Sequence, residues 1–174
     1  NELPKKESTF DAIILLDVIE HLIQPFDVLK KLHSLLKPNG VIYLSTPNKL
    51  SFLNFIIDPH FSLPIVSILK RKNVKRVLAD WLGWQPKGRV DFPELMTLNK
   101  LDQVMRNCGF DWRFVNLQVA AFSLENPESV WNRNSHLLII NALKKLQMVV
   151  LIGRIVSNRF DFFNTWLNPT WFLM

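Results

Sequence analysis

The chain has 174 residues, of which 48% are hydrophobic and 21% are charged. These values allow one globular domain with a hydrophobic core and exclude an intrinsically disordered protein. The single cysteine, Cys108, excludes an intrachain disulfide and a CxxC metal site, and the polar first ten residues predict no signal peptide. We therefore expect a cytoplasmic protein, with peripheral contact at a membrane left open.

The net charge of +6 is concentrated in one segment. Residues 70–89 hold seven basic side chains against one acidic side chain, Asp80, and the rest of the chain carries equal numbers of both. The positive charge is therefore a property of this segment.

Residues 10–48 predict a strand, a helix and a second strand. Residues 10–16 form a continuous apolar run, which is typical of a parallel strand buried on both faces. Residues 26–36 show apolar side chains at helical spacing, and the Lys-Pro-Asn-Gly sequence at 37–40 ends the helix in a left-handed turn. A second apolar run, residues 41–44, predicts the next strand.

Polar side chains follow both predicted strands. A helical crossover gives parallel strands whose carboxyl ends share one edge of the sheet, where ligands of open α/β sheets bind. That edge would carry Asp17, Glu20, His21, Thr46 and Asn48. The sequence therefore places a candidate site there.

Asp17, Glu20 and His21 have a spacing that puts all three on one face of a helical turn. Two carboxylates and an imidazole suit either a metal ion or general-base chemistry, and His21 is the better base because imidazole titrates near neutrality. His60, in the turn at residues 58–60, could add a ligand or a base. The alternative is that Glu20 and His21 only cap the following helix.

Four pieces of the stretch together resemble one known family. They are Phe10-Asp11, VIEHL at 18–22, LLKPNG at 35–40 and STPN at 45–48, and they resemble the fourth and fifth strands of class I S-adenosylmethionine-dependent methyltransferases. The resemblance implies an α/β fold with a partial Rossmann-like sheet and S-adenosylmethionine as cofactor. It also implies methyl transfer, with oxygen favoured, to a small-molecule, lipid-linked or sugar-linked acceptor.

The resemblance also implies roles for individual residues. Glu20 and His21 would be catalytic, and they would bind Mg²⁺ together with Asp17, as the E-x-x-E-H run does in some O-methyltransferases. Asp17 would also line the methionine end of the cofactor with its neighbour Val18. The acceptor would contact Thr46, Asn48 and His60.

The chain contains five glycines and no G-x-G sequence. In the resembled family a glycine-rich turn after the first strand allows the backbone to approach the cofactor. We therefore expect this chain to be the C-terminal part of a methyltransferase domain and an enzyme only when completed by an N-terminal half. The alternative is a non-catalytic membrane-surface or interaction module derived from a methyltransferase.

We divide the chain into residues 1–48, the strand-helix-strand core; 49–92, a basic, aromatic lid insertion; and 93–174, the C-terminal part of the core. In the lid, residues 64–82 predict an amphipathic helix with its apolar face at Val74, Val77, Leu78, Trp81 and Leu82. Its basic residues could contact an anionic membrane or a phosphorylated or lipid-linked acceptor, or could simply face water. No nucleic-acid motif is present, so we expect no nucleic-acid partner.

The third segment begins with a well-marked helix. Thr97 is a candidate N-cap, Gly109 a candidate terminator, and the buried stripe is Leu98, Leu101, Val104, Met105 and Cys108. Residues 110–119 predict a strand, and 170–174 the beginning of a last strand. Residues 136–156 predict a long hydrophobic helix, which Lys144 and Lys145 make unsuitable for spanning a membrane.

Overall fold

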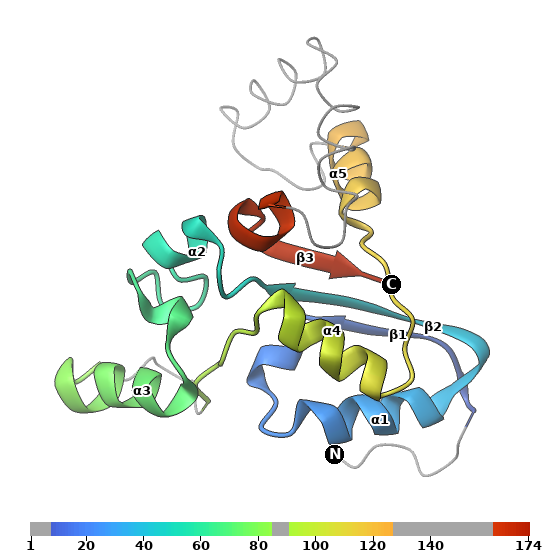
Figure 1. Cartoon of the computed structure of the whole chain (residues 1–174), viewed down its shortest axis with the longest axis horizontal. Coiled ribbons are helices and arrows are strands. Elements are labelled where there is room, and N and C mark those ends of the chain that lie inside the picture. The colour runs from blue at the N-terminus through green and yellow to red at the C-terminus, as the bar shows by residue number, and fades with distance from the viewer. Residues whose placement is uncertain (1–7, 85–90, 127–161) are drawn as a thin grey trace.

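The computed structural model describes residues 8–84, 91–126 and 162–174. It is an α/β structure with a three-stranded sheet in the order β1-β2-β3 (Figure 1). Strand β1 (Phe10–Leu16) pairs in parallel with β2 (Leu36–Pro47), and β3 (Thr170–Leu173) pairs antiparallel with the other side of β2. The predicted fold class, a partial Rossmann-like sheet, is confirmed, and so is the last strand.

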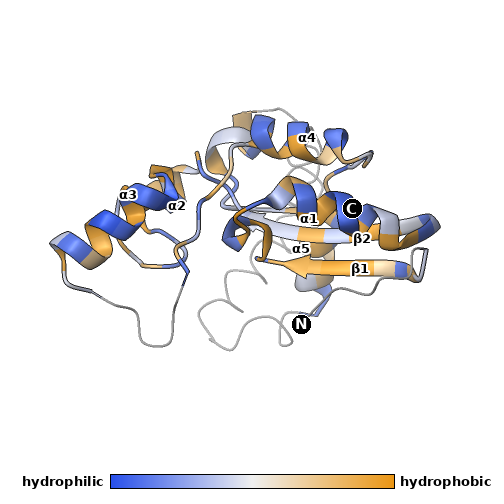
Figure 2. Cartoon of the chain, turned by 90° about the horizontal axis from the view of Figure 1, so that it is seen from below, coloured by the Kyte–Doolittle hydropathy of each residue, from blue (hydrophilic) through white to orange (hydrophobic). Residues whose placement is uncertain are grey.

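Helix α1 (Pro25–Leu35) crosses from β1 to β2, and it lies beside α4 (Leu98–Asn107) on one face of the sheet (Figures 1 and 2). Pro25 starts α1, where a missing amide hydrogen costs nothing. The predicted N-cap of α4 is confirmed, since the Thr97 hydroxyl accepts a hydrogen bond from Lys100 N at 3.3 Å. Gly109, with a φ of +90°, ends the helix as expected.

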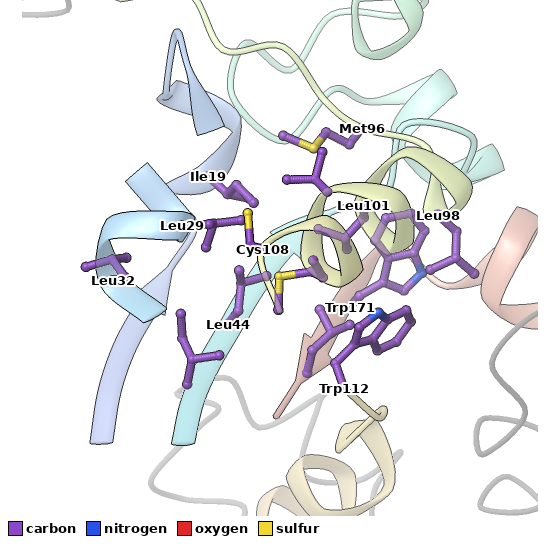
Figure 3. Packing of buried hydrophobic residues seen from close by; sticks show 14 of the residues in the cluster. Ile19, Leu29, Leu32, Leu44, Met96, Leu98, Leu101, Cys108, Trp112 and Trp171 are labelled. Atoms are coloured by element: carbon purple, nitrogen blue, oxygen red, sulfur yellow. The ribbon is translucent and has the colours of Figure 1, made fainter. Parts of the chain in front are cut away.

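One hydrophobic cluster joins these elements (Figure 3). Apolar side chains from the sheet, from α1 and from α4 meet there, and the predicted stripe of α4 is buried in full. Its largest members are Trp112 and Trp171, which are almost completely buried. Burial of about 25 cal/mol per Å² of apolar surface makes this cluster the main source of stability.

The predicted burial of β1 on both faces is wrong. Ile14 is 66% exposed and Leu16 is 59% exposed, although both are apolar. Strand β1 is an outer strand of the sheet, and no described element covers the face on which these side chains lie. Figure 2 shows β1 as a largely hydrophobic strand at the sheet edge.

Strand β2 begins at Leu36, earlier than the predicted Val41. The expected left-handed turn is present, since Asn39 has a φ of +64°. It forms a bulge within the strand, because pairing with Phe10 has already started at Leu36. Gly40 allows the close approach: a Cβ there would lie 3.1 Å from the Phe10 carbonyl oxygen.

The strand predicted for residues 110–119 is replaced by a short extended segment and helix α5 (Asn116–Glu125). Val115 N donates to Phe172 O at 2.8 Å, as in a sheet. The Asn116 side-chain oxygen then accepts from Phe172 N at 2.7 Å. This side chain takes the place of the next backbone acceptor, so strand pairing stops and the helix starts.

Residues 49–84 project from the sheet and contain four short helical pieces (Figure 1). These are α2 (Phe52–Ile56), η2 (Val66–Ile68), α3 (Arg71–Lys75) and the π-helical turn η3 (Arg76–Trp81). The basic helix predicted within residues 64–82 is present as α3 and η3, from Arg71 to Trp81. The residues before it do not join it, because Ile65 has a φ of +70° and its N–H donates to Phe55 O at 2.7 Å.

The predicted apolar face of this segment is only partly buried. Val74 and Leu78 pack with Phe61 and Val66 in a second hydrophobic cluster. Trp81 is 73% exposed and Leu82 is 57% exposed, so the buried face ends at Leu78.

The long hydrophobic helix predicted at 136–156 lies outside the described residues. Within the described ranges, no helix is both long enough and apolar enough to cross a membrane.

Candidate functional site

The site starts where β1 leaves the sheet. Asp17 has a φ of +52°, which turns the chain away from the strand direction. Its amide donates to Ser45 O at 3.1 Å, and its carboxylate accepts from the Ser45 hydroxyl at 2.9 Å. The end of β1 is thus fixed to the end of β2, as the parallel pairing requires.

The short turn η1 (Ile19–His21) follows and places Glu20 in the interior. Glu20 has no exposed surface. Its Oε2 accepts a hydrogen bond from the Thr46 hydroxyl at 3.0 Å, whereas Oε1 accepts none from the described residues. A buried carboxylate oxygen without a hydrogen-bond donor costs free energy, so Oε1 is the unsatisfied polar atom of the site.

Two imidazoles flank this carboxylate. His60 Nε2 lies 3.6 Å from Glu20 Oε1, and the His21 and His60 rings meet edge to face with centroids 5.1 Å apart. One ligand atom from each of the three residues lies within 4.8 Å of the other two. His21 Nδ1 also pairs with a carboxylate oxygen of Asp91, which leaves Nε2 as its second ring nitrogen.

His60 reaches the site through a turn built by Asp58. The buried Asp58 carboxylate accepts hydrogen bonds from His60 N and Phe61 N, both at 2.9 Å. An aspartate commonly closes such a turn with its own side chain. Phe61 is then anchored in the second hydrophobic cluster, so the position of His60 is fixed by the projecting segment.

Arg71 ties the same segment to η1. Its Nη2 donates to Glu20 O and to Leu22 O, both at 2.9 Å. Glu94 N donates to Glu20 O at 2.9 Å, and the Glu94 carboxylate accepts from Arg71 N at 3.1 Å. The backbone around Glu20 is therefore held by two other segments.

Of the predicted site residues, the structure gathers Glu20, His21 and His60, with Thr46 in contact with Glu20. Asp17 is not one of the clustered residues, and its carboxylate is bonded to Ser45 instead. Val18, next to Asp17, is partly exposed at the same edge of the sheet. The residues that could hold a metal ion thus differ from the predicted set by the exchange of Asp17 for His60.

Asn48 directly follows the end of β2. It has no exposed surface, and its side-chain amide donates to the carbonyl oxygens of Asn164, Thr165 and Asn168 at 2.9 to 3.2 Å. Its side-chain oxygen accepts from Leu50 N at 2.9 Å. In this structure Asn48 joins the end of β2 to the C-terminal segment, and a contact with an acceptor stays a prediction.

Sequence reasoning missed Asp91, Arg71 and Asp58. Asp91 and Arg71 act across 70 and 49 to 51 residues of sequence, so no local spacing reveals them. Asp58 did carry a local signal, since an aspartate two residues before His60 is typical of a side-chain-closed turn.

Comparison with known proteins agrees with this architecture. A family model described as a methyltransferase domain matches residues 1–113. The ubiquinone biosynthesis O-methyltransferase of Parvibaculum lavamentivorans is 29% identical over 102 residues, which are 58% of this chain and 33% of that protein. A protein of the same name from Cereibacter sphaeroides is 30% identical over 104 residues, with 59% and 34% covered.

The chain spans about a third of the length of these curated relatives. Among solved structures, the cyclase SpnF is 13% identical, with a TM-score of 0.41 and coverage of 99% of this chain and 51% of that chain. The family match over residues 1–113, well over half of the sequence, decides the assignment. The chain belongs to the methyltransferase domain family, the class I S-adenosylmethionine-dependent methyltransferases.

Proposed function

We propose that the chain forms the acceptor side of an S-adenosylmethionine-dependent O-methyltransferase that acts on a small molecule with a hydroxyl group. The observation that carries this proposal is the cluster of Glu20, His21 and His60 beyond the carboxyl end of β1. Ligands of open α/β sheets bind at this edge. Family membership supplies the reaction class, and the O-methyltransferase relatives support oxygen as the methylated atom.

The reaction is an in-line attack of the acceptor oxygen on the methyl group of the cofactor. The new C–O bond forms as the C–S bond breaks, and the hydroxyl proton passes to a base. We assign this role to His21, because the Asp91 carboxylate orients its ring and stabilises the imidazolium that forms. Glu20, held by Thr46, would keep negative charge next to both imidazoles.

The same three residues also fit a divalent metal ion, and in that alternative His21 would be a ligand and not the base, because a nitrogen bound to a metal cannot accept a proton. They offer one carboxylate oxygen and two imidazole nitrogens within 4.8 Å, and the buried Glu20 Oε1 lacks a hydrogen-bond donor among the described residues. Imidazole ligands favour a transition metal such as Fe²⁺, Ni²⁺ or Zn²⁺ over Mg²⁺, which prefers oxygen. A bound ion would lower the pKa of the acceptor hydroxyl as a Lewis acid.

For the cofactor, we propose that Asp17 and Val18 at the end of β1 face its methionine end. Both are exposed at that edge, which supports contact with a ligand. Residues 49–92 would then act as the lid over the acceptor, because they deliver His60 and Asp91 to the site.

We also propose that the projecting segment contacts an anionic membrane. The protein would then lie in the cytoplasm at the membrane periphery and could receive a lipid-linked acceptor there. The segment exposes many large apolar side chains, namely Phe52, Leu53, Phe55, Ile56, Ile57, Ile65, Trp81 and Leu82. The basic residues Lys72, Lys75 and Arg76 are exposed on the adjoining helix. Apolar insertion next to basic side chains is the usual composition of a peripheral membrane surface.

Vesicle binding tests the membrane proposal. We expect the protein to sediment with vesicles containing phosphatidylglycerol and to be released by salt, because the attraction of basic side chains is screened. The triple variant Lys72→Gln, Lys75→Gln, Arg76→Gln should lose binding. Equal binding to uncharged phosphatidylcholine vesicles would contradict a role for the basic residues.

Labelled methyl transfer tests the reaction. With S-adenosylmethionine carrying a ¹³C methyl group and a panel of hydroxylated aromatic acceptors, we expect a ¹³C methyl ether that mass spectrometry and NMR identify. A product methylated at nitrogen or carbon would contradict the assignment of oxygen. Vesicle binding without any transfer would favour the non-catalytic module.

A further inference from the structure

A cavity of about 510 Å³ is lined by the residues that follow η1, by the start of α1, by Lys49 and Arg71, and by residues between 94 and 100. None of Glu20, His21 and His60 lines it. Part of its wall is apolar and includes Leu22, Ile23 and Met96. The cavity can therefore hold an apolar group of several carbon atoms.

Its charged lining is mainly positive. Three cations, Lys49, Arg71 and Lys100, face a single carboxylate, Glu94. The Glu94 carboxylate accepts a hydrogen bond from the Arg71 backbone amide, and the Arg71 guanidinium donates to the carbonyl oxygens of Glu20 and Leu22. The two lysine side chains form no ion pair with any described carboxylate, so both ammonium groups are available to an anionic ligand.

Lys49 is the better placed of the two. Its backbone N–H donates to Met96 O at 3.0 Å, which fixes the residue at the cavity wall directly after β2. The pKa of the Lys49 ammonium is lowered, mainly by burial and also by the charge of Lys70, while the carboxylate of Glu94 acts in the opposite direction. A half-buried cation of this kind gains more from an anionic partner than a fully hydrated lysine does.

We infer that this cavity binds the anionic end of an amphiphilic small molecule, a carboxylate or a phosphate carried on an apolar body. The anion would pair with Lys49 and Lys100, and the apolar body would lie against Leu22, Ile23 and Met96. This assignment depends on the cavity and its lysines, and it holds whether or not the protein transfers methyl groups.

Calorimetric titration with short amphiphiles below their micelle concentration tests the inference. Decanoate and decyl phosphate distinguish the two anionic groups, decanol lacks the charge, and inorganic phosphate lacks the apolar body. We expect one of the two amphiphilic anions to bind at least about tenfold more tightly than decanol and than inorganic phosphate, as a hydrogen-bonded charge pair allows.

Variants locate the binding. Lys49→Gln and, independently, Lys100→Gln should each weaken binding of the anion by about tenfold and leave decanol binding unchanged. Lys72→Gln is the matched control, because Lys72 is exposed on α3 and does not line the cavity. Unfolding curves of all variants show whether each is folded. Weakening by Lys72→Gln alone, decanol binding as tight as the anions, or no binding of either anion would overturn the inference.

Discussion

The buried carboxylate of Glu20 depends on a hydrogen bond from a single neighbouring residue. Its carboxylate is completely buried, and the Thr46 hydroxyl is the donor for Oε2. The free-energy cost of burying this charge is therefore offset partly by the hydrogen bond from Thr46, a residue of the neighbouring strand β2. The pair is a direct link between the stability of the fold and the integrity of the site.

Thr46→Val keeps the shape of the side chain and removes that donor. We expect a loss of about 1–3 kcal/mol in the free energy of unfolding, because both carboxylate oxygens would then lack a described donor. Urea unfolding measures the change. Thr170→Val, at a half-buried position of β3, is the control, and an equal effect of both variants would contradict the role of the Thr46 hydroxyl.

The lowered pKa of Lys49 predicts that the free energy of unfolding depends on pH. Burial lowers the pKa of Lys49 in the folded state, so the folded protein releases this proton before the unfolded chain does. Between the lowered pKa and the ordinary value of 10.5 the unfolded state binds more protons, and stability from this group rises with pH. Below that window the cost of the buried charge is fully present.

Lys49→Met should therefore raise the urea midpoint at pH 7, and its advantage over wild type should shrink as the pH approaches 10.5. Glu94 and Lys70, the other charges that act on Lys49, are unchanged in this variant. Lys72→Met serves as the exposed control. An advantage that stays constant with pH would contradict the burial of charge at Lys49.

Among the elements, the packing of α1 against α4 can be measured through the reactivity of Cys108, which lies between them. The thiol is buried, its Sγ lies 3.4 Å from Phe26 O, and burial raises its pKa. The reactive thiolate is thus both scarce and covered.

Labelling of Cys108 by a maleimide at pH 8 should be slow in the native protein and fast in urea. Because the chain has a single cysteine, the labelling rate reports on this interface alone. Leu29→Ala, which removes a fully buried side chain of α1, should speed the labelling as it destabilises the core by about 2–5 kcal/mol. Native labelling at the rate seen in urea would contradict the packing.

Asn48 links two further elements, β2 and the turn η4 (Phe163–Leu167) with the residues after it. Asn48→Ala would leave three carbonyl oxygens and the Leu50 amide without this partner. We expect a loss of at least about 2 kcal/mol in the free energy of unfolding. The exposed Asn99→Ala in α4 should have little effect. A stable Asn48→Ala protein with weakened acceptor binding would support the substrate role.

The elements themselves were largely predictable. Helices α1 and α4 and strand β1 follow from apolar spacing and from caps that lie within a few residues of each helix. The break at Ile65 was not predictable, because it depends on a hydrogen bond to Phe55 in another helix. The exposure of Ile14 depends on which elements cover the sheet, and no local pattern contains that information.

At the scale of the whole molecule, the site joins parts of the chain that are far apart in sequence. Glu20 and His21 were predicted from their spacing beyond a strand and His60 from its turn in the projecting segment, whereas Asp91 lies beyond that segment and was not predicted. The sequence therefore named all three clustered residues, Glu20, His21 and His60. Their meeting depends on the fold of residues 49–84, because the hydrophobic cluster around Phe61 sets the position of His60.

The measurement that tests the central proposal most directly compares methyl transfer by wild type, His21→Asn and His33→Asn, each carried in a methyltransferase domain that includes the N-terminal, cofactor-binding half. His33 is an exposed histidine of α1, so it controls for the loss of an imidazole outside the site. We predict that His21→Asn lowers the rate of transfer by at least about 100-fold, with an unchanged Kd for S-adenosylmethionine in calorimetry, and that His33→Asn transfers at the wild-type rate. Transfer by His21→Asn at the wild-type rate would contradict the assignment of the site.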